Sequence, residues 1–331
     1  MKTLFDKTII KNMELKNRFI RSATQEIMAE EDGHLNDRLY ELYENLAKGG
    51  VGLIITSGAY ITADSKSMPG QIGFYNDNFI EEYQKLTYTI HGHESKVLLQ
   101  VNYATKNGQN LKPDDVSLED IEAIISAFGD AAARAEKAGF DGVEIHAAHG
   151  FLLSQFLSSR TNMRTDQYGG TLENNARIII EIYNAIRSRT SKDFVVFLKV
   201  NSFDEIDSEK AFESCQYICS QLSDSGIDGI EISGEGEASD YKESIYRDYA
   251  AKISALNNNI PIILVCKNRT PDTMVQILNT TGVEYFALSR PLIRQPDLVN
   301  LWMKDLNEVP KCISCSKCMQ PNGTSCIFNK D

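Results

Sequence analysis

The sequence is poor in two features, long apolar runs and positive charge, and each shortage excludes a class of partner. None of the 331 residues lie in an apolar run of 18, which excludes a membrane-spanning helix. The N-terminal segment MKTLFDKTII lacks a long apolar core and a small-residue cleavage site, so we expect a cytoplasmic protein. The net charge of −12 argues against nucleic acid, because phosphate binding needs a clustered positive field. A small-molecule partner is expected, and a homo-oligomer stays open.

Cysteine is scarce in the body of the chain. Cys215, Cys219 and Cys266 stand alone there and are expected to be reduced thiols. The other four crowd into the last twenty residues as Cys312, Cys315, Cys318 and Cys326. The C-x2-C-x2-C spacing resembles part of an iron-sulfur ligand run with Cys326 as a fourth ligand, and zinc accepts four thiolates at similar spacing. The pattern indicates a metal-binding tail, with a vestigial tail as the alternative.

Short apolar runs alternate with helix-patterned stretches along the whole chain. Strands are expected at residues 18–23, 51–56, 97–101, 140–145, 194–200, 229–232, 261–265 and 285–288. Helices are expected at residues 35–48, 77–91, 117–138, 171–189, 208–225, 244–256, 271–280 and 296–304. Strands that are continuous apolar runs indicate a parallel sheet covered by helices. Eight such units predict an α/β fold, a single (β/α)8 TIM barrel over residues 1–305 with a short Cys-rich tail over 306–331. An open doubly wound sheet is the alternative.

In such a barrel, the functional side chains lie at the carboxyl ends of the strands. That rule places six residues on one rim: Gln25, Gly58, Gln100, His146, Lys199 and Ser289. The Gln100 amide offers a donor and an acceptor, which suits the edge of a heteroaromatic ring. A cation on a buried strand such as Lys199 needs an electron-rich partner. A flavin carbonyl, a salt bridge to Glu144 or Glu231, and a Schiff base all satisfy that need.

Two further features of this rim suggest ligands. His146 and His149 are three residues apart after the fourth strand, so both could donate to a carbonyl oxygen; metal ligation and a purely structural pair are the alternatives. The loops 266–269 and 289–291 follow strands seven and eight, where phosphate often binds in this fold. Both carry cationic side chains, but neither has the glycines that let backbone amides approach a phosphate.

Long motifs in the chain resemble the Old Yellow Enzyme family of FMN-dependent NADH:flavin oxidoreductases. The most specific are EIHAAHGFLLSQFLS, TNMRTDQYGG and LENNAR within residues 144–177, joined by Leu15–Phe19, Gln100 and Leu288–Pro291. The cysteine tail is similar to that of the 2,4-dienoyl-CoA reductase-like branch, of which this sequence has the barrel domain. The resemblance implies FMN at the barrel mouth, NADH or NADPH as reductant, and hydride transfer to an activated alkene, as in an ene-reductase.

The resemblance also implies a role for each rim residue. The face of the flavin ring would lie along Ser22, Ala23, Thr24 and Gln25. The ring edges and the N1 locus would meet Gly58, Gln100 and Lys199. The FMN phosphate would be held by Ser289 and Arg290, and the substrate oxygen by His146 and His149.

The sequence departs from the family pattern at the expected proton donor. Phe151 stands where relatives have a tyrosine, and phenylalanine has no acidic proton to give. Tyr103 occupies a position where relatives usually have histidine, and we hypothesise that it supplies the missing phenol. The glycines of the phosphate loops are replaced by Cys266, Lys267 and Ser289. The alternatives are therefore a flavoprotein with altered chemistry, such as oxygen reduction or disproportionation, or a degenerate barrel with a binding or regulatory role.

Overall fold

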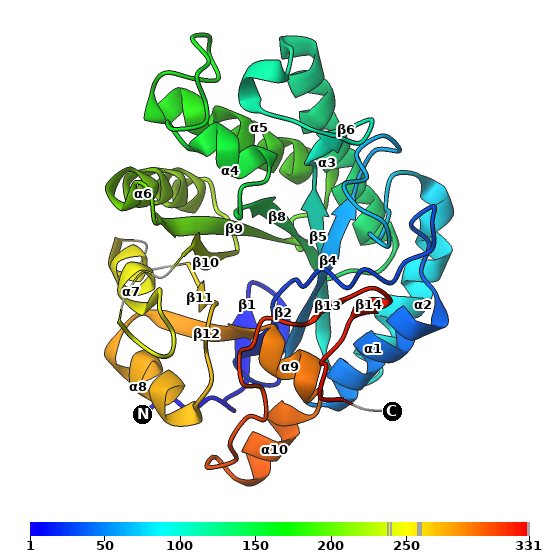
Figure 1. Cartoon of the computed structure of the whole chain (residues 1–331), viewed down its shortest axis with the longest axis vertical. Helices are drawn as coiled ribbons and strands as arrows, with labels where there is room; N and C mark the ends of the chain where they lie inside the picture. Colours follow the sequence, from blue (N-terminus) through cyan, green and yellow to red (C-terminus); the bar gives the residue numbers. More distant parts are fainter. Residues whose placement is uncertain (237, 239, 257–259, 330–331) are drawn as a thin grey trace.

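Eight parallel strands close into a barrel in the computed structural model, which describes residues 1–236, 238, 240–256 and 260–329. Helices surround the strands (Figure 1). The closed order confirms the predicted TIM barrel and excludes the open sheet. The barrel strands in chain order are β3 (Phe19–Arg21), β4 (Leu53–Tyr60), β5 (Lys96–Asn102), β8 (Gly142–Ala147), β9 (Val195–Asp204), β10 (Gly229–Glu235), β11 (Ile262–Leu264) and β12 (Val283–Leu288).

The helices follow the strands as the sequence predicts. They are α1 (Asp37–Lys48), α2 (Ile80–His91) after the short turn η1 (Asp77–Phe79), α3 (Leu118–Lys137), α4 (Leu152–Leu157), α5 (Leu172–Arg189), α6 (Ser208–Asp224), α7 (Arg247–Leu256), α8 (Pro271–Thr280), α9 (Arg290–Arg294) and α10 (Leu298–Lys304). The Ser117 hydroxyl caps α3 by accepting from the Asp120 amide, as its position predicts. None of these helices, in the described part of the chain, is long and apolar enough to cross a membrane.

Several expected boundaries were wrong, each for a local reason. The helix expected from residue 244 begins at Arg247, because Ser244 has a φ of +50°, which a right-handed helix does not allow. The last helix begins at Leu298 rather than residue 296, and the unpredicted α9 precedes it. Strand β9 runs on to Asp204, well past the expected end at residue 200, because it stays paired with β10 as far as Glu235.

An N-terminal hairpin covers the amino-terminal end of the barrel. It consists of β1 (Thr8–Ile10) and β2 (Met13–Leu15), paired antiparallel. Its buried residues Ile10, Met13 and Leu15 share one apolar cluster with barrel residues, among them the first residues of β4 and β9, Leu53 and Val195. The hairpin thus closes the end of the barrel opposite the carboxyl rim. The sequence did not predict it, since three-residue strands give little periodic signal.

The Cys-rich tail folds back onto the carboxyl rim. Its small hairpin, β13 (Met319–Gln320) and β14 (Gly323–Thr324), lies beside the segment that follows β3 (Figure 1). The Thr324 amide donates to the Glu26 carbonyl at 2.7 Å, and the Thr324 hydroxyl donates to the Gln25 carbonyl at 2.5 Å. The tail is therefore attached to the barrel mouth. Its last two residues, 330–331, lie outside the described residues.

Candidate active site at the barrel mouth

A buried ion pair occupies the centre of the rim. The Lys199 ammonium on β9 lies 2.7 Å from a carboxylate oxygen of Glu231 on the adjacent β10. The Ser22 hydroxyl joins both, accepting from Lys199 at 2.9 Å and donating to Glu231 at 2.7 Å. Burial disfavours the ammonium, but Glu231 and Glu144 outweigh it and raise the pKa of Lys199. The salt-bridge interpretation of Lys199 is thus observed, and the cation stays charged at the mouth.

A second carboxylate, Glu144 on β8, orients Gln100 on β5. The Gln100 amide nitrogen donates to Glu144 at 2.7 Å. Its amide oxygen faces Gly58, where a Cβ would come within 3.0 Å of that oxygen. Glycine at this position therefore leaves room for the glutamine side chain. Burial and the neighbouring Glu231 raise the pKa of Glu144 to about 8, although Lys199 and the Gln100 hydrogen bond act in the opposite direction.

The two histidines lie together at the mouth, as predicted. Their ring centroids are 5.4 Å apart and nearly perpendicular. His149 has a φ of +59°, a left-handed backbone that few non-glycine residues adopt, although histidine does so more often than most. The Nε2 atom of His149 lies 2.7 Å from the Ser233 hydroxyl of β10, whereas Nδ1 of the buried His146 has no hydrogen-bond partner in the described part of the chain.

Both imidazoles are neutral at neutral pH. Burial, followed by His149 and the Lys199 charge, lowers the pKa of His146 well below its usual value. Desolvation and the Lys199 charge also lower the pKa of His149, whose side chain is more open to solvent. A neutral imidazole carries one N–H donor, so the pair can hold an oxygen atom without bringing a second positive charge beside Lys199.

The two candidate proton-donor positions differ in their surroundings. The Phe151 ring packs against His146, with centroids 4.8 Å apart, so it faces the histidine pair. The Tyr103 hydroxyl lies beside Thr62, and burial together with Asp64 raises its pKa. Of the two, Phe151 is the residue whose ring contact with a histidine is observed among the described residues.

One hollow joins the histidine end of the mouth to the loops after β11 and β12. The lining residues include Ser22, Ala23, His149, Lys199, Cys266, Lys267, Arg269, Ser289, Arg290 and Ser314. Cys266 and Lys267 have φ values of +82° and +55°. They keep the left-handed backbone that glycine favours, although each carries a side chain. Successive backbone amides in such loops form anion-binding concavities, so the missing glycines do not remove this geometry.

The remaining predicted residues border the same mouth. The Ser57 hydroxyl donates to the Gln25 amide oxygen at 3.0 Å, and the Thr24 hydroxyl donates to the Ser22 carbonyl at 3.1 Å. Several buried polar atoms on the strands and segments around the mouth have no hydrogen-bond partner among the described residues: Gln25 Nε2, Asn102 Oδ1, Glu144 Oε1, His146 Nδ1 and Glu231 Oε2. Buried polar groups are usually hydrogen-bonded. Such atoms could pair with a polar ligand that has several donors and acceptors, such as a flavin.

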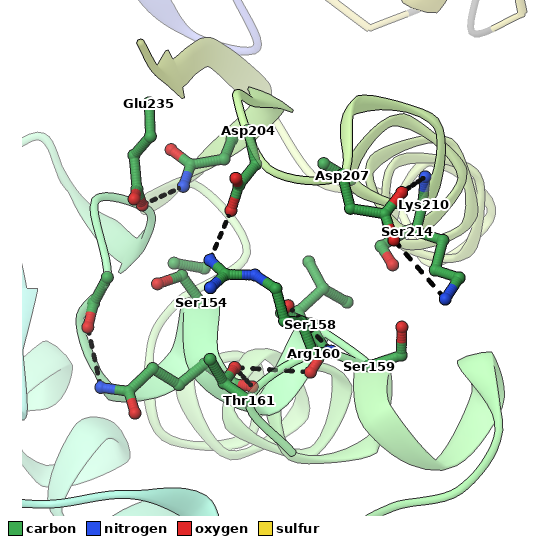
Figure 2. A pocket seen from close by; sticks show the side chains of 16 residues that line it. Ser154, Ser158, Ser159, Arg160, Thr161, Asp204, Asp207, Lys210, Ser214 and Glu235 are labelled. Carbon is green, nitrogen blue, oxygen red and sulfur yellow. Dashed lines mark hydrogen bonds and ion pairs between the residues drawn. The ribbon is translucent and has the colours of Figure 1, made fainter. Parts of the chain in front are cut away.

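A second hollow lies beside the mouth, between α4 and the loop from β9 to α6 (Figure 2). The Arg160 guanidinium reaches across it to Asp204 at 2.8 Å. Asn201 connects this hollow to the mouth, since it donates to Glu235 at 2.8 Å and accepts from the His149 amide at 3.2 Å. The hollow therefore begins directly behind the backbone of His149.

The four tail cysteines are unpaired and gather in one region. None forms a disulfide. Burial and the proximity of Cys312, Cys326 and Cys315 raise the pKa of Cys318. Among the described residues, no three Cys, His, Asp or Glu side chains are arranged closely enough to hold a metal ion. The donor chemistry suits a thiolate-bound metal, while the ligand geometry is not assembled.

Some site residues were missed or only half recognised in the sequence. Glu144 and Glu231 were considered only as ion partners of Lys199. A glutamate within an otherwise apolar strand was the available signal, because a buried charge requires a partner. Ser233 and Asn201, which contact His149, carried no sequence signal at all. Their role depends on the register between neighbouring strands.

The model of the NADH:flavin oxidoreductase / NADH oxidase family matches residues 3–110 and 102–308. An NADH oxidase of Thermoanaerobacter brockii is 29% identical over 95% of this chain, which spans only 52% of that protein. An NADPH dehydrogenase of Clostridium acetobutylicum is 30% identical over 93% of this chain and 97% of its own length.

A solved structure supports the fold independently. The old yellow enzyme homologue from Zymomonas mobilis superimposes with a TM-score of 0.82 at 21% identity, over 94% of this chain and 95% of that chain. Since the family model matches nearly the whole barrel, the family membership that the resemblance implied is confirmed: the chain belongs to the NADH:flavin oxidoreductase / NADH oxidase family.

Proposed function

We propose that the chain is an FMN-dependent oxidoreductase that takes hydride from NADH or NADPH and reduces an activated alkene. The observation that carries the proposal is the continuous hollow from His149 and Lys199 to Arg290. It offers a cation at one end and a phosphate-type loop at the other, as FMN requires. FMN bound there supplies the hydride-accepting and hydride-donating centre.

In this proposal, residues at the barrel mouth would bind the flavin ring and the substrate oxygen. Lys199, kept charged by Glu231, would stabilise negative charge on the reduced ring. Gln100, oriented by Glu144, would bind the ring edge. His146 and His149 would donate hydrogen bonds to the substrate's carbonyl oxygen, so that the β-carbon becomes a better hydride acceptor.

Completing the reduction of an alkene requires a proton at the neighbouring carbon. Phe151 has none to give, so we keep Tyr103 as the hypothesised donor. A phenol is protonated at neutral pH, although burial raises the pKa of Tyr103 and so makes it a weaker acid than a free tyrosine. Replacing Tyr103 with Phe should slow alkene reduction without changing flavin reduction by NADH. An unchanged rate would mean that water or another group supplies the proton.

The first experiment is to purify the protein and record its absorbance, before and after incubation with FMN. A flavin spectrum, followed by anaerobic bleaching with NADH or NADPH and reoxidation by an enone, would support the proposal. Bleaching followed by reoxidation with oxygen but with no enone would favour the second candidate, a flavoprotein with altered chemistry, which the contact of Phe151 with His146 motivates. Failure to bind FMN would leave a binding or regulatory barrel.

We also propose that Cys312, Cys315, Cys318 and Cys326 hold an iron-sulfur cluster or a zinc ion. The support is the gathering of four free thiols in one region of the tail. Metal analysis and the spectrum of anaerobically purified protein distinguish iron from zinc. Cys315→Ser should lose the metal, whereas the matched control Cys219→Ser, in the core at α6, should keep it. Light scattering during gel filtration would determine whether the chain forms a homo-oligomer.

A further inference from the structure

The tail contacts the two arginines of the phosphate loops. Arg290, expected to hold the FMN phosphate, donates from Nη1 to the Ser316 hydroxyl at 3.0 Å. Arg269, in the loop after β11, donates from Nη1 to the Ser314 hydroxyl at 2.9 Å and from Nη2 to the Cys312 carbonyl. In the sequence, the two serines lie on either side of the second tail cysteine, Cys315.

The serines also lie where they can influence the flavin site. Ser314 lines the same hollow as Lys199, Ser289 and Arg290. Ser314 and Ser316 both have a φ of +57°, a conformation that costs a non-glycine residue energy. The tail loop thus adopts an unfavourable backbone at the two positions whose hydroxyls meet the arginines.

From these contacts we infer that Ser314 and Ser316 are positioning residues, through which the cysteine loop aims Arg269 and Arg290 at the FMN phosphate. The inference rests on the proposed function. A guanidinium has five N–H donors in a fixed plane, so one hydrogen bond to a serine fixes the plane and leaves other donors for the phosphate. An arginine that is already fixed loses less conformational entropy when the ligand binds.

The tail also contacts the barrel away from the two arginines, at the segment that follows β3. Thr324 bonds to the backbone of Gln25 and Glu26, in the segment expected to face the flavin ring. The buried pair of Arg21 and Glu26 connects that segment to the phosphate loop, since Arg21 Nη1 donates to the Ser289 carbonyl at 2.7 Å. The tail therefore contacts the segment that follows β3 as well as the loops that follow β11 and β12.

The test compares FMN with riboflavin, which lacks the phosphate. The apoprotein is titrated with each flavin, and the dissociation constant is read from fluorescence quenching. The variant Ser314→Ala/Ser316→Ala should bind FMN about tenfold more weakly, since a hydrogen bond to a charged group is commonly worth that much. Its affinity for riboflavin should equal that of the wild type. The matched control Ser325→Ala alters a tail serine that bonds to neither arginine.

Three results would overturn the inference. They are an unchanged affinity for FMN, a tighter one, or an equal loss for FMN and riboflavin, which would indicate a general effect on the fold. A wild-type protein that binds neither flavin would instead refute the proposed function itself. Thermal unfolding of each variant, measured alongside, must match the wild type for a loss specific to FMN to count in favour.

Discussion

The phenyl ring of Phe151 packs against the imidazole of His146, with ring centroids 4.8 Å apart. A phenol at residue 151 would therefore lie beside the histidine pair, which is proposed to hold the substrate oxygen. We expect Phe151→Tyr to accelerate alkene reduction by about tenfold to a hundredfold, since general acids typically contribute 10²–10⁴-fold. Anaerobic stopped-flow reoxidation of the reduced protein by 2-cyclohexenone measures the rate. Phe151→Leu, without a hydroxyl, should not accelerate it; a Phe151→Tyr rate equal to the wild type would show that proton delivery is not limiting.

The ion pair between Lys199 and Glu231 predicts a non-additive loss of stability. Removing one member of a buried pair leaves an unpaired charge and costs about 3–5 kcal/mol. Lys199→Met should therefore lower the free energy of unfolding by about that amount, while Lys199→Met/Glu231→Gln should recover most of it. Urea unfolding of the apoproteins measures both. If the double variant were as unstable as the single one, Glu231 would not be the charge that Lys199 neutralises.

The positions of these residues could be predicted from the sequence, but their side-chain partners could not. The apolar runs predicted the order of the strands. Positions at the ends of those runs predicted that Gln100, His146 and Lys199 lie at the mouth. The partners of these residues did not, because Glu231 meets Lys199 only through the register of β10 on β9. The contact of Ser316 with Arg290 joins residues 26 positions apart, in a tail without periodic pattern. The left-handed backbone at Cys266 and Lys267 was also hidden, since the absence of glycine suggested the opposite.

Glu144 predicts how stability depends on pH. Its pKa in the folded protein is raised to about 8, so at intermediate pH the folded state binds a proton that the unfolded state releases. Its contribution to stability is thus fully present below the unfolded pKa and is lost as pH rises through the folded value. Between about pH 5 and about pH 8, wild-type apoprotein should lose stability relative to Glu144→Gln, whose amide does not titrate. The difference between the two urea midpoints isolates this group from His146, and a constant difference would show that Glu144 is ionised throughout.

The histidine pair predicts substrate binding that does not respond to pH. Because the pKa values of both His146 and His149 are lowered, neither should gain a proton between about pH 6 and about pH 8, where a free histidine titrates. The dissociation constant of the oxidised protein for 2-cyclohexenone, followed by the change in flavin absorbance, should stay constant over that range. His149→Asn keeps an N–H donor and should bind within about threefold of the wild type, whereas His149→Ala should bind up to about tenfold more weakly, as the loss of one hydrogen bond allows. Affinity that rises as pH falls toward 6 would instead show that a charged imidazolium holds the oxygen.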